Sequence, residues 1–346
     1  MVVVSWSSDS VAQFEPALLV EKTGEDGKPE SYLKTLCSRI YFMVYSPDNN
    51  ELSINYKYRN PLVLETTHWE NIRRLPGLRM MAYSPDSTLL ATAEGRDGLQ
   101  IWERGERNPL RRLGEDDDLV LYTAFSPDGK TLASTSGKKG VRIWNPASGD
   151  LIHTLKGHKK KVRCLVFSTD GKTLFTGSDR SIKLWNTSTW EEVASWRTPQ
   201  KAGDITGMTF SSNGVTLATV HSQLGVMVWN TTNSSAYVLR GKSCAAFSPD
   251  GTQIAVGRKD VFIYDIKLHK DPQGHMDVVT EATEKIKIQE LMLKDACHGH
   301  TLNSRVDYGD DPRSTSFDNV VALAYTPDGK TLAAGCYDGT IRFFGR

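Results

Sequence analysis

A hydrophobic and polar pattern of about 40 residues recurs along most of this chain, and its clearest copy runs from residue 120 to residue 155. Apolar residues fill 120–125, small residues fill 131–136, apolar and polar residues alternate in 141–144, and a short run follows at 151–155. Short runs of this kind, separated by turn residues, are typical of β-strands. Each copy therefore predicts four antiparallel strands.

The breaks between the predicted strands have the chemistry of tight turns. In Ser126-Pro127-Asp128-Gly129, proline presets φ, aspartate can bond its own backbone, and glycine permits a positive φ. The same turn or a close variant begins at Ser46, Ser84, Ser126, Ser168, Ser211, Ser248 and Thr326. The steps between these residues are 38, 42, 42, 43, 37 and 78. Seven units are expected, with either an insertion or a degenerate extra repeat before the last.

The ends of the predicted third strands share an apolar residue, then an aromatic residue, then often Asp or Asn. Examples are Ile143-Trp144-Asn145, Leu184-Trp185-Asn186 and Val228-Trp229-Asn230, and the pair Gly157-His158 precedes one copy. These residues resemble the WD-repeat family of β-propellers. The resemblance covers residues 31–346. It implies an all-β, seven-bladed β-propeller of four-stranded antiparallel blades, forming a single domain over 1–346.

The resemblance also implies a structural hydrogen-bond set in the copy that follows Gly157-His158. Its members are His158, Ser178, Asp179 and Trp185, with Thr176 as the other candidate for the hydroxyl. Other copies lack one or more members. The first copy is the weakest, because Leu64 stands at the Trp185 position. We interpret it as a degenerate blade.

Two segments depart from the repeat. The family closes its ring by pairing an N-terminal strand with the last blade, so we expect a closing strand within 1–38, at 31–36 or alternatively at 17–20. Residues 267–319 are predicted to form an insertion between the sixth and seventh blades. Within it, 284–294 alternates like a strand, although a four-residue spacing in 278–286 would also fit a helix. The strand is favoured.

Composition excludes several classes of function. Lys and Arg number 42 against 41 Asp and Glu, so a net charge of +1 predicts no attraction to nucleic acid or to an anionic membrane. The cysteines are odd in number and lack CxxC spacing, which argues against a disulfide framework and a zinc module. They are Cys37, Cys164, Cys244, Cys297 and Cys336. A reducing compartment is expected, the cytoplasm or alternatively the nucleus.

The sequence predicts no catalytic residue, cofactor or metal ion. GxSxG, GxGxxG and GxxxxGK[ST] are absent. His298-Gly299-His300 follows Cys297, but no second cluster stands at zinc-finger spacing, so a solvated loop is expected. Arg73-Arg74 and Arg111-Arg112 lack the flanking Phe and Gly of phosphoinositide-binding propellers. The alternatives to a binding protein are a propeller enzyme of hydrolase or lactonase type and a phosphoinositide-binding propeller.

Two neighbouring loops carry opposite charge when Phe125 is aligned with Phe167. The acidic loop contains Glu115, Asp116, Asp117 and Asp118, and the basic loop contains Lys159, Lys160 and Lys161, with Arg163 following. Both join a fourth strand to the next first strand, so in a propeller both open on the same face beside the channel. The loops either solvate each other or form a dipolar patch that orients a partner. We infer a non-catalytic interaction scaffold or adaptor, a monomeric propeller within a multiprotein complex, that binds proteins or peptides at the channel mouth.

Overall fold

The structure is a computed structural model. It describes residues 18–23, 29–34, 40–56, 60–67, 71–75, 80–93, 98–114, 120–136, 140–239, 244–257, 260–270, 276–286, 320–337 and 339–345.

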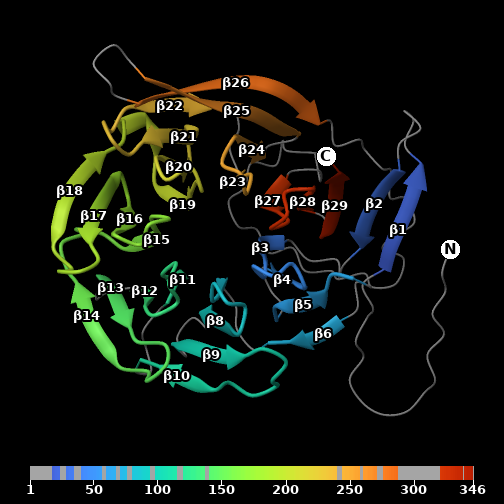
Figure 1. The fold of residues 1–346 in the computed structure, drawn as a ribbon, viewed down its shortest axis with the longest axis horizontal. Helices are drawn as coiled ribbons and strands as arrows, with labels where there is room; N and C mark the ends of the chain where they lie inside the picture. Colours follow the sequence, from blue (N-terminus) through green and yellow to red (C-terminus); the bar gives the residue numbers. More distant parts are fainter. Residues whose placement is uncertain are drawn as a thin grey trace, which may run out of the picture.

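Seven antiparallel sheets stand radially around a central opening (Figure 1). Blade 1 contains β3 (Ile40–Tyr45), β4 (Glu51–Tyr56), β5 (Leu62–Glu65) and β6 (Asn71–Arg74). Blade 2 contains β7 (Met81–Tyr83), β8 (Leu89–Ala93), β9 (Leu99–Glu103) and β10 (Arg111–Leu113). Blade 3 contains β11 (Thr123–Phe125), β12 (Leu132–Ser136), β13 (Gly140–Trp144) and β14 (Leu151–Leu155). Blade 4 contains β15 (Val162–Phe167), β16 (Thr173–Ser178), β17 (Ser181–Asn186) and β18 (Glu192–Arg197).

The remaining three blades complete the ring. Blade 5 contains β19 (Ile205–Phe210), β20 (Thr216–His221), β21 (Gly225–Asn230) and β22 (Ala236–Leu239). Blade 6 contains β23 (Cys244–Phe247), β24 (Gln253–Gly257), β25 (Val261–Lys270) and β26 (Met276–Ile286). Blade 7 contains β27 (Val320–Tyr325), β28 (Thr331–Cys336), β29 (Thr340–Gly345), β2 (Pro29–Lys34) and β1 (Leu18–Thr23). The prediction of an all-β, seven-bladed propeller with four-stranded blades is confirmed, and blade 7 has β1 as a fifth strand outside β2.

Each first strand ends in a turn whose side chains hold the backbone. In blade 3, Ser126 Oγ donates to Asp128 Oδ1 at 2.6 Å and accepts from the Thr131 amide at 3.0 Å, while Gly129 has a φ of +71°. Equivalent side-chain bonds to an aspartate begin at Ser46, Ser84, Ser168, Ser248 and Thr326. A short polar motif therefore fixes the same chain reversal in blade after blade.

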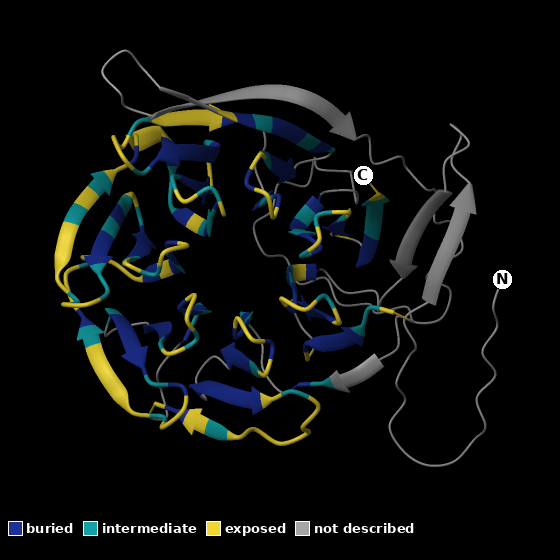
Figure 2. Cartoon of the chain, in the orientation of Figure 1, coloured by how far each residue is buried: buried dark blue, intermediate teal, exposed yellow. Residues whose placement is uncertain are grey.

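The core lies between blades rather than within any one of them. Seven clusters of buried apolar side chains each combine residues from two neighbouring blades. In one, Ile143 of blade 3 packs with Leu165 and Trp185 of blade 4, and another joins Ile54 of blade 1 to Ile341 of blade 7. Buried residues therefore follow the inner strands, and exposed ones gather on the outer strands and turns (Figure 2).

Blade 7 is completed by strands from the other end of the chain. β2 pairs antiparallel with β29, from Ser31 opposite Phe343 to Lys34 opposite Thr340. The expected closing segment 31–36 overlaps β2, and its last two residues lie outside the described ones. The alternative segment 17–20 overlaps β1, which pairs with β2 instead of β29.

The predicted insertion does not begin where the sequence suggested. Residues 267–270 continue β25, and β26 pairs with it along its length, so the fourth strand of blade 6 starts at Met276 and not at 284. Val278, Ala282 and Ile286 lie in this strand, which rules out the helical alternative there. The β-branched residues of 278–283 favour a strand and were the missed signal. Residues 287–319 lie outside the described part.

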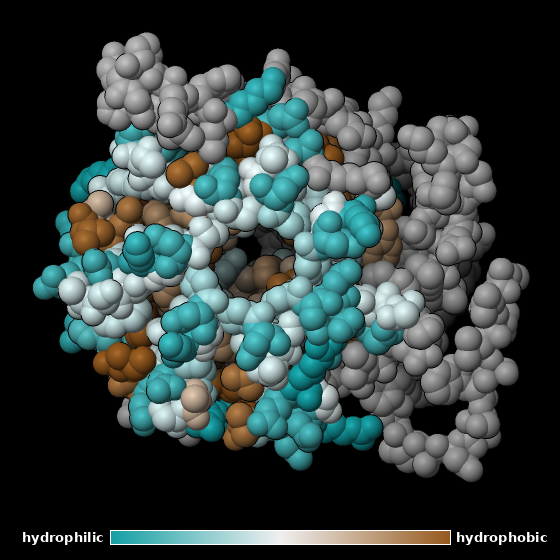
Figure 3. Space-filling view, in the orientation of Figure 1, coloured by the Kyte–Doolittle hydropathy of each residue, from teal (hydrophilic) through white to brown (hydrophobic). Residues whose placement is uncertain are grey.

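The connections between strands define two faces of the propeller. Consecutive antiparallel strands are joined at alternate ends, so the fourth-to-first connections and the second-to-third turns lie on one face, which we call the loop face. The Ser-Pro-Asp turns lie on the opposite face, which we call the turn face. Hydrophilic side chains surround the central opening in the space-filling view (Figure 3). Among the described residues, no helix is long and apolar enough to cross a membrane.

Candidate functional site

Bulges near the start of the first strand, at its loop-face end, change the direction of a side chain in four blades. In blades 1, 4, 5 and 7 the register shifts by one residue at the same place in the strand. The extra residues are Tyr41, Arg163, Thr206 and Val321. Such a bulge re-aims a side chain without ending the strand. Tyr41 is 57% exposed as a result, although large apolar side chains are usually more buried than this.

The basic loop lies between β14 and β15, and its charged side chains have partners that the sequence did not reveal. Lys160 Nζ lies 3.3 Å from Asp179 Oδ2, and Arg163 Nη2 lies 2.9 Å from Asp204 Oδ2. The interaction with the Asp204 carboxyl is the first cause that lowers the pKa of Asp179, and the Lys160 ammonium adds to it. The four side chains form one continuous ionic cluster across blades 4 and 5.

The acidic half of the predicted patch, Glu115–Asp118, lies outside the described residues. Its opposition to the basic loop stays a prediction. What the cluster changes is the role of Lys160 and Arg163: Lys160 is engaged by Asp179 of blade 4, and Arg163 by Asp204 of blade 5. Lys159 and Lys161 are exposed and form no ion pair with a residue that the structure describes.

Two further cations stand on the loop face beside this cluster and were missed by sequence reasoning. Arg180 follows Asp179 in the turn between β16 and β17, and Lys201 lies in the short 3-10 helix η1 (Gln200–Ala202) before β19. Both side chains are exposed. Aligning the repeats could have placed Arg180 and Lys201 beside the basic loop, because the turns between second and third strands and the loops between fourth and first strands lie on this same face.

A buried hydroxyl connects the basic loop to the body of blade 4. Thr176 Oγ1 accepts a hydrogen bond from Trp185 Nε1 at 2.8 Å and lies 2.7 Å from His158 Nε2. The predicted set assigned the hydroxyl to Ser178, but Ser178 donates to the Lys160 carbonyl at 2.9 Å. Register explains the difference: Trp185 lies opposite Leu174 and reaches Thr176 diagonally, whereas Ser178 lies opposite Ser181 at the end of the strand.

His158 is a neutral structural residue in this setting. Burial, with a smaller contribution from the Lys183 ammonium, lowers its pKa from 6.5 to about 4, and Glu192 only partly opposes this. The Thr176 hydroxyl accepts from the indole and lies within donating distance of the Lys183 carbonyl at 3.4 Å, and the tautomer of His158 sets which partner donates in the bond between Thr176 Oγ1 and His158 Nε2. Asp179 does not complete the set as predicted; its carboxylate pairs with Lys160, and Ser181 Oγ lies 3.5 Å from His158 Nδ1.

The same tryptophan bond recurs in three other blades. Indole nitrogens donate to hydroxyls at Trp102–Thr92 (2.9 Å), Trp144–Ser134 (2.8 Å) and Trp229–Thr219 (2.8 Å). In blade 5 a histidine again joins it, because His221 Nε2 lies 2.8 Å from Thr219 Oγ1. This histidine comes from strand β20 instead of the preceding loop, so a search for Gly-His pairs could not find it.

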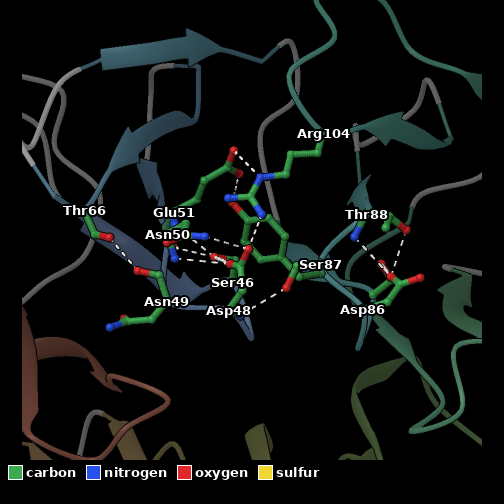
Figure 4. Close-up of polar contacts among 12 residues, drawn as sticks. Ser46, Asp48, Asn49, Asn50, Glu51, Thr66, Asp86, Ser87, Thr88 and Arg104 are labelled. Atoms are coloured by element: carbon green, nitrogen blue, oxygen red, sulfur yellow. Dashed lines mark hydrogen bonds and ion pairs between the residues drawn. The ribbon is translucent and has the colours of Figure 1, made fainter.

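Blade 1, which has Leu64 in place of the tryptophan, is tied to blade 2 by a charged network on the turn face (Figure 4). Arg104 Nε lies 3.1 Å from Oε1 of the buried Glu51, and the same guanidinium pairs with Asp48. Tyr83 Oη donates to Glu51 Oε2 at 2.9 Å. Burial alone would raise the pKa of Asp48, but hydrogen bonds from Ser46 and Arg104 lower it to about 2.

Neither a metal centre nor a catalytic set emerges from the side chains that the structure describes. Within that part of the chain, no three His, Cys, Asp or Glu residues are grouped to hold a metal ion. Cys297, His298 and His300 lie outside it. The pairs Arg73-Arg74 and Arg111-Arg112 lie on the fourth strands β6 and β10. The loop face with its bulge-directed and basic side chains is therefore the candidate site.

Comparison with known families agrees with this architecture. A model described as "WD domain, G-beta repeat" matches residues 107–145, 149–186 and 313–344. The first two matches cover strands of blades 3 and 4, which flank the basic loop, and the third covers the C-terminal strands of blade 7. No curated protein matches the chain.

Proposed function

Because the chain carries WD repeats in a seven-bladed β-propeller, we propose that it is a non-catalytic scaffold or adaptor that holds other proteins in a complex. Propellers of this family commonly serve as platforms for protein interaction. The fold alone does not specify a function, so the proposal rests on the loop face. The partner-binding surface that we propose centres on the basic loop between blades 3 and 4.

The observation that carries the proposal is a local excess of exposed positive charge among the described residues of blades 4 and 5. Lys159, Lys161, Arg180 and Lys201 are exposed around an ionic cluster whose own charges balance. The whole chain has a net charge of only +1, so this excess is a local feature. It supports an acidic segment of a partner protein as the ligand. A nucleic acid would require a longer basic surface than one sector of a nearly neutral protein.

Exposed aromatic side chains on other blades support a protein as the ligand. Tyr41 of blade 1 is 57% exposed, and Tyr337, in the turn between β28 and β29 of blade 7, is 37% exposed. Tyrosine is enriched at the centres of protein interfaces. A protein segment could therefore engage the basic sector through charge and the tyrosines through apolar contact.

The setting that we propose is a reducing compartment such as the cytoplasm or the nucleus. Cys164, Cys244 and Cys336 are free thiols in the structure, and burial raises the pKa of the Cys164 and Cys244 thiols. Buried thiols of this kind act as small apolar core residues. A single propeller within a larger complex is the form that we expect.

Affinity purification of the intact protein tests the scaffold proposal. The variant Lys159→Glu/Lys161→Glu reverses exposed charges and leaves Lys160 in place, because Lys160 pairs with Asp179. The control Lys130→Glu/Lys172→Glu makes the same charge change at exposed positions on the turn face. We expect the loop-face variant to lose an acidic partner that the control retains, with an association rate lower by about tenfold at low salt. Equal recovery with all three proteins would contradict the proposal.

A further inference from the structure

The outer strand of blade 6 is much longer than its counterparts. β26 has 11 residues, whereas β6, β10, β14, β18 and β22 have 4, 3, 5, 6 and 4. Proteins commonly keep edge strands short, because an unpaired edge is a template for another strand. Among the described strands, only β25 is hydrogen-bonded to β26. The edge of β26 that pairs with no described strand is thus about twice as long as that of any other described fourth strand.

Part of β26 belongs to a two-stranded ribbon that projects past the blade (Figure 1). Pairing between β24 and β25 reaches Asp265, opposite Gln253. β25 continues to Lys270, which lies opposite Met276 of β26. Two strands without a third are only marginally stable in water. A third strand added along β26 would stabilise this ribbon.

The direction of the β26 backbone groups follows from one hydrogen bond and the register. The Ile266 amide donates to the Thr252 carbonyl, on the side of β25 away from β26. Backbone groups alternate in direction along a strand, so those of Lys267 point toward β26, where Val279 lies opposite. Val278, Thr280 and Ala282 then direct their amides and carbonyls away from β25. These groups form the row that an added strand would use.

We propose that β26 accepts an extended, basic segment of a partner protein as an additional strand. Main-chain hydrogen bonds supply affinity in this mode of recognition. The charge of β26 selects the partner, since its sequence has Asp277, Glu281 and Glu284 against a single Lys285. Opposite charges across neighbouring strands are stabilising and like charges are destabilising. A second copy of this acidic strand is therefore a poor occupant, and a lysine-rich or arginine-rich one fits.

Peptide binding to the full-length protein tests the proposal. The probe is a capped synthetic peptide of alternating valine and lysine, and the matched peptide has glutamate for each lysine. We expect the basic peptide to slow amide exchange at Val278, Thr280 and Ala282, and to bind at least about tenfold more tightly than the acidic one. The Thr280→Pro variant removes one outward amide, which an edge strand tolerates, and should weaken binding about tenfold. Thr280→Val keeps the amide and should bind normally.

Three results would overturn the proposal. The first is that the basic peptide does not slow amide exchange in β26. The second is that the peptide binds equally to Thr280→Pro and Thr280→Val when both variants melt like the original protein. The third is that the chain forms a dimer that Thr280→Pro dissociates. This surface is separate from the basic loop, so Lys159→Glu/Lys161→Glu should not change binding of the probe. Failure of one proposal is thereby distinguishable from failure of the other.

Discussion

Replacing Thr176 with valine tests the buried bond that anchors the basic loop. The side chain is fully buried, and valine matches its shape while removing the oxygen that both Trp185 Nε1 and His158 Nε2 contact. A buried polar group left without a partner costs about 1–3 kcal/mol, so two such groups predict a loss of about 3 kcal/mol in the free energy of unfolding. Among the described residues the Thr92 hydroxyl is bonded to Trp102 alone, so Thr92→Val should cost about half as much.

Urea unfolding followed by tryptophan fluorescence measures these differences. Thr176→Ser is the matched control, since it keeps the hydroxyl and removes one methyl group, at a cost of about 1 kcal/mol. The expected order of stability is the original protein, then Thr176→Ser, then Thr176→Val. A Thr176→Val protein within about 0.5 kcal/mol of the original would refute the reasoning, because that is the range of neutral surface substitutions.

Three other outcomes are expected. Arg104→Met should cost about 3–5 kcal/mol, because it leaves the buried Glu51 carboxylate without its cation, and adding Glu51→Gln should recover part of the loss in urea unfolding. The pKa values of His158 and His221 are lowered from 6.5 to about 4 in the folded protein, so between these pH values the unfolded chain binds more protons than the folded one. The free energy of unfolding should therefore fall as the pH is lowered from 6.5 toward 4. A constant urea midpoint between pH 7 and pH 5 would contradict this. Deleting residues 1–38 removes β1 and β2 and exposes β29, so the product should lose cooperative melting in calorimetry.

The fold could be predicted because its signals are local. Each Ser-Pro-Asp turn forms its bonds within six residues, as Ser126 does with Asp128 and Thr131, so the motif reports the chain reversal directly. Trp144 and its equivalents mark the third strands for a similar reason, since the indole bonds a hydroxyl on the adjacent strand. Repetition of such signals gives the number of blades.

The details of the site could not be predicted from the sequence, because they depend on strand register and on contacts between residues that are far apart in the chain. The choice of Thr176 over Ser178 follows from the diagonal reach of Trp185 between paired strands, which spacing alone does not give. The pairing of Arg163 with Asp204 joins two blades and has no local signature. β26 was misplaced because its pairing with β25, not its own periodicity, sets where the strand begins.

Amide hydrogen exchange on the complex with a co-purified partner tests the central claim most directly. The scaffold account predicts slower exchange in the loop-face segments 156–163, 179–181 and 200–206 when the partner is bound. Exchange at the turns that begin at Ser126 and Ser168 on the turn face should stay unchanged. Protection confined to the turn face, with none at the basic loop, would contradict the account.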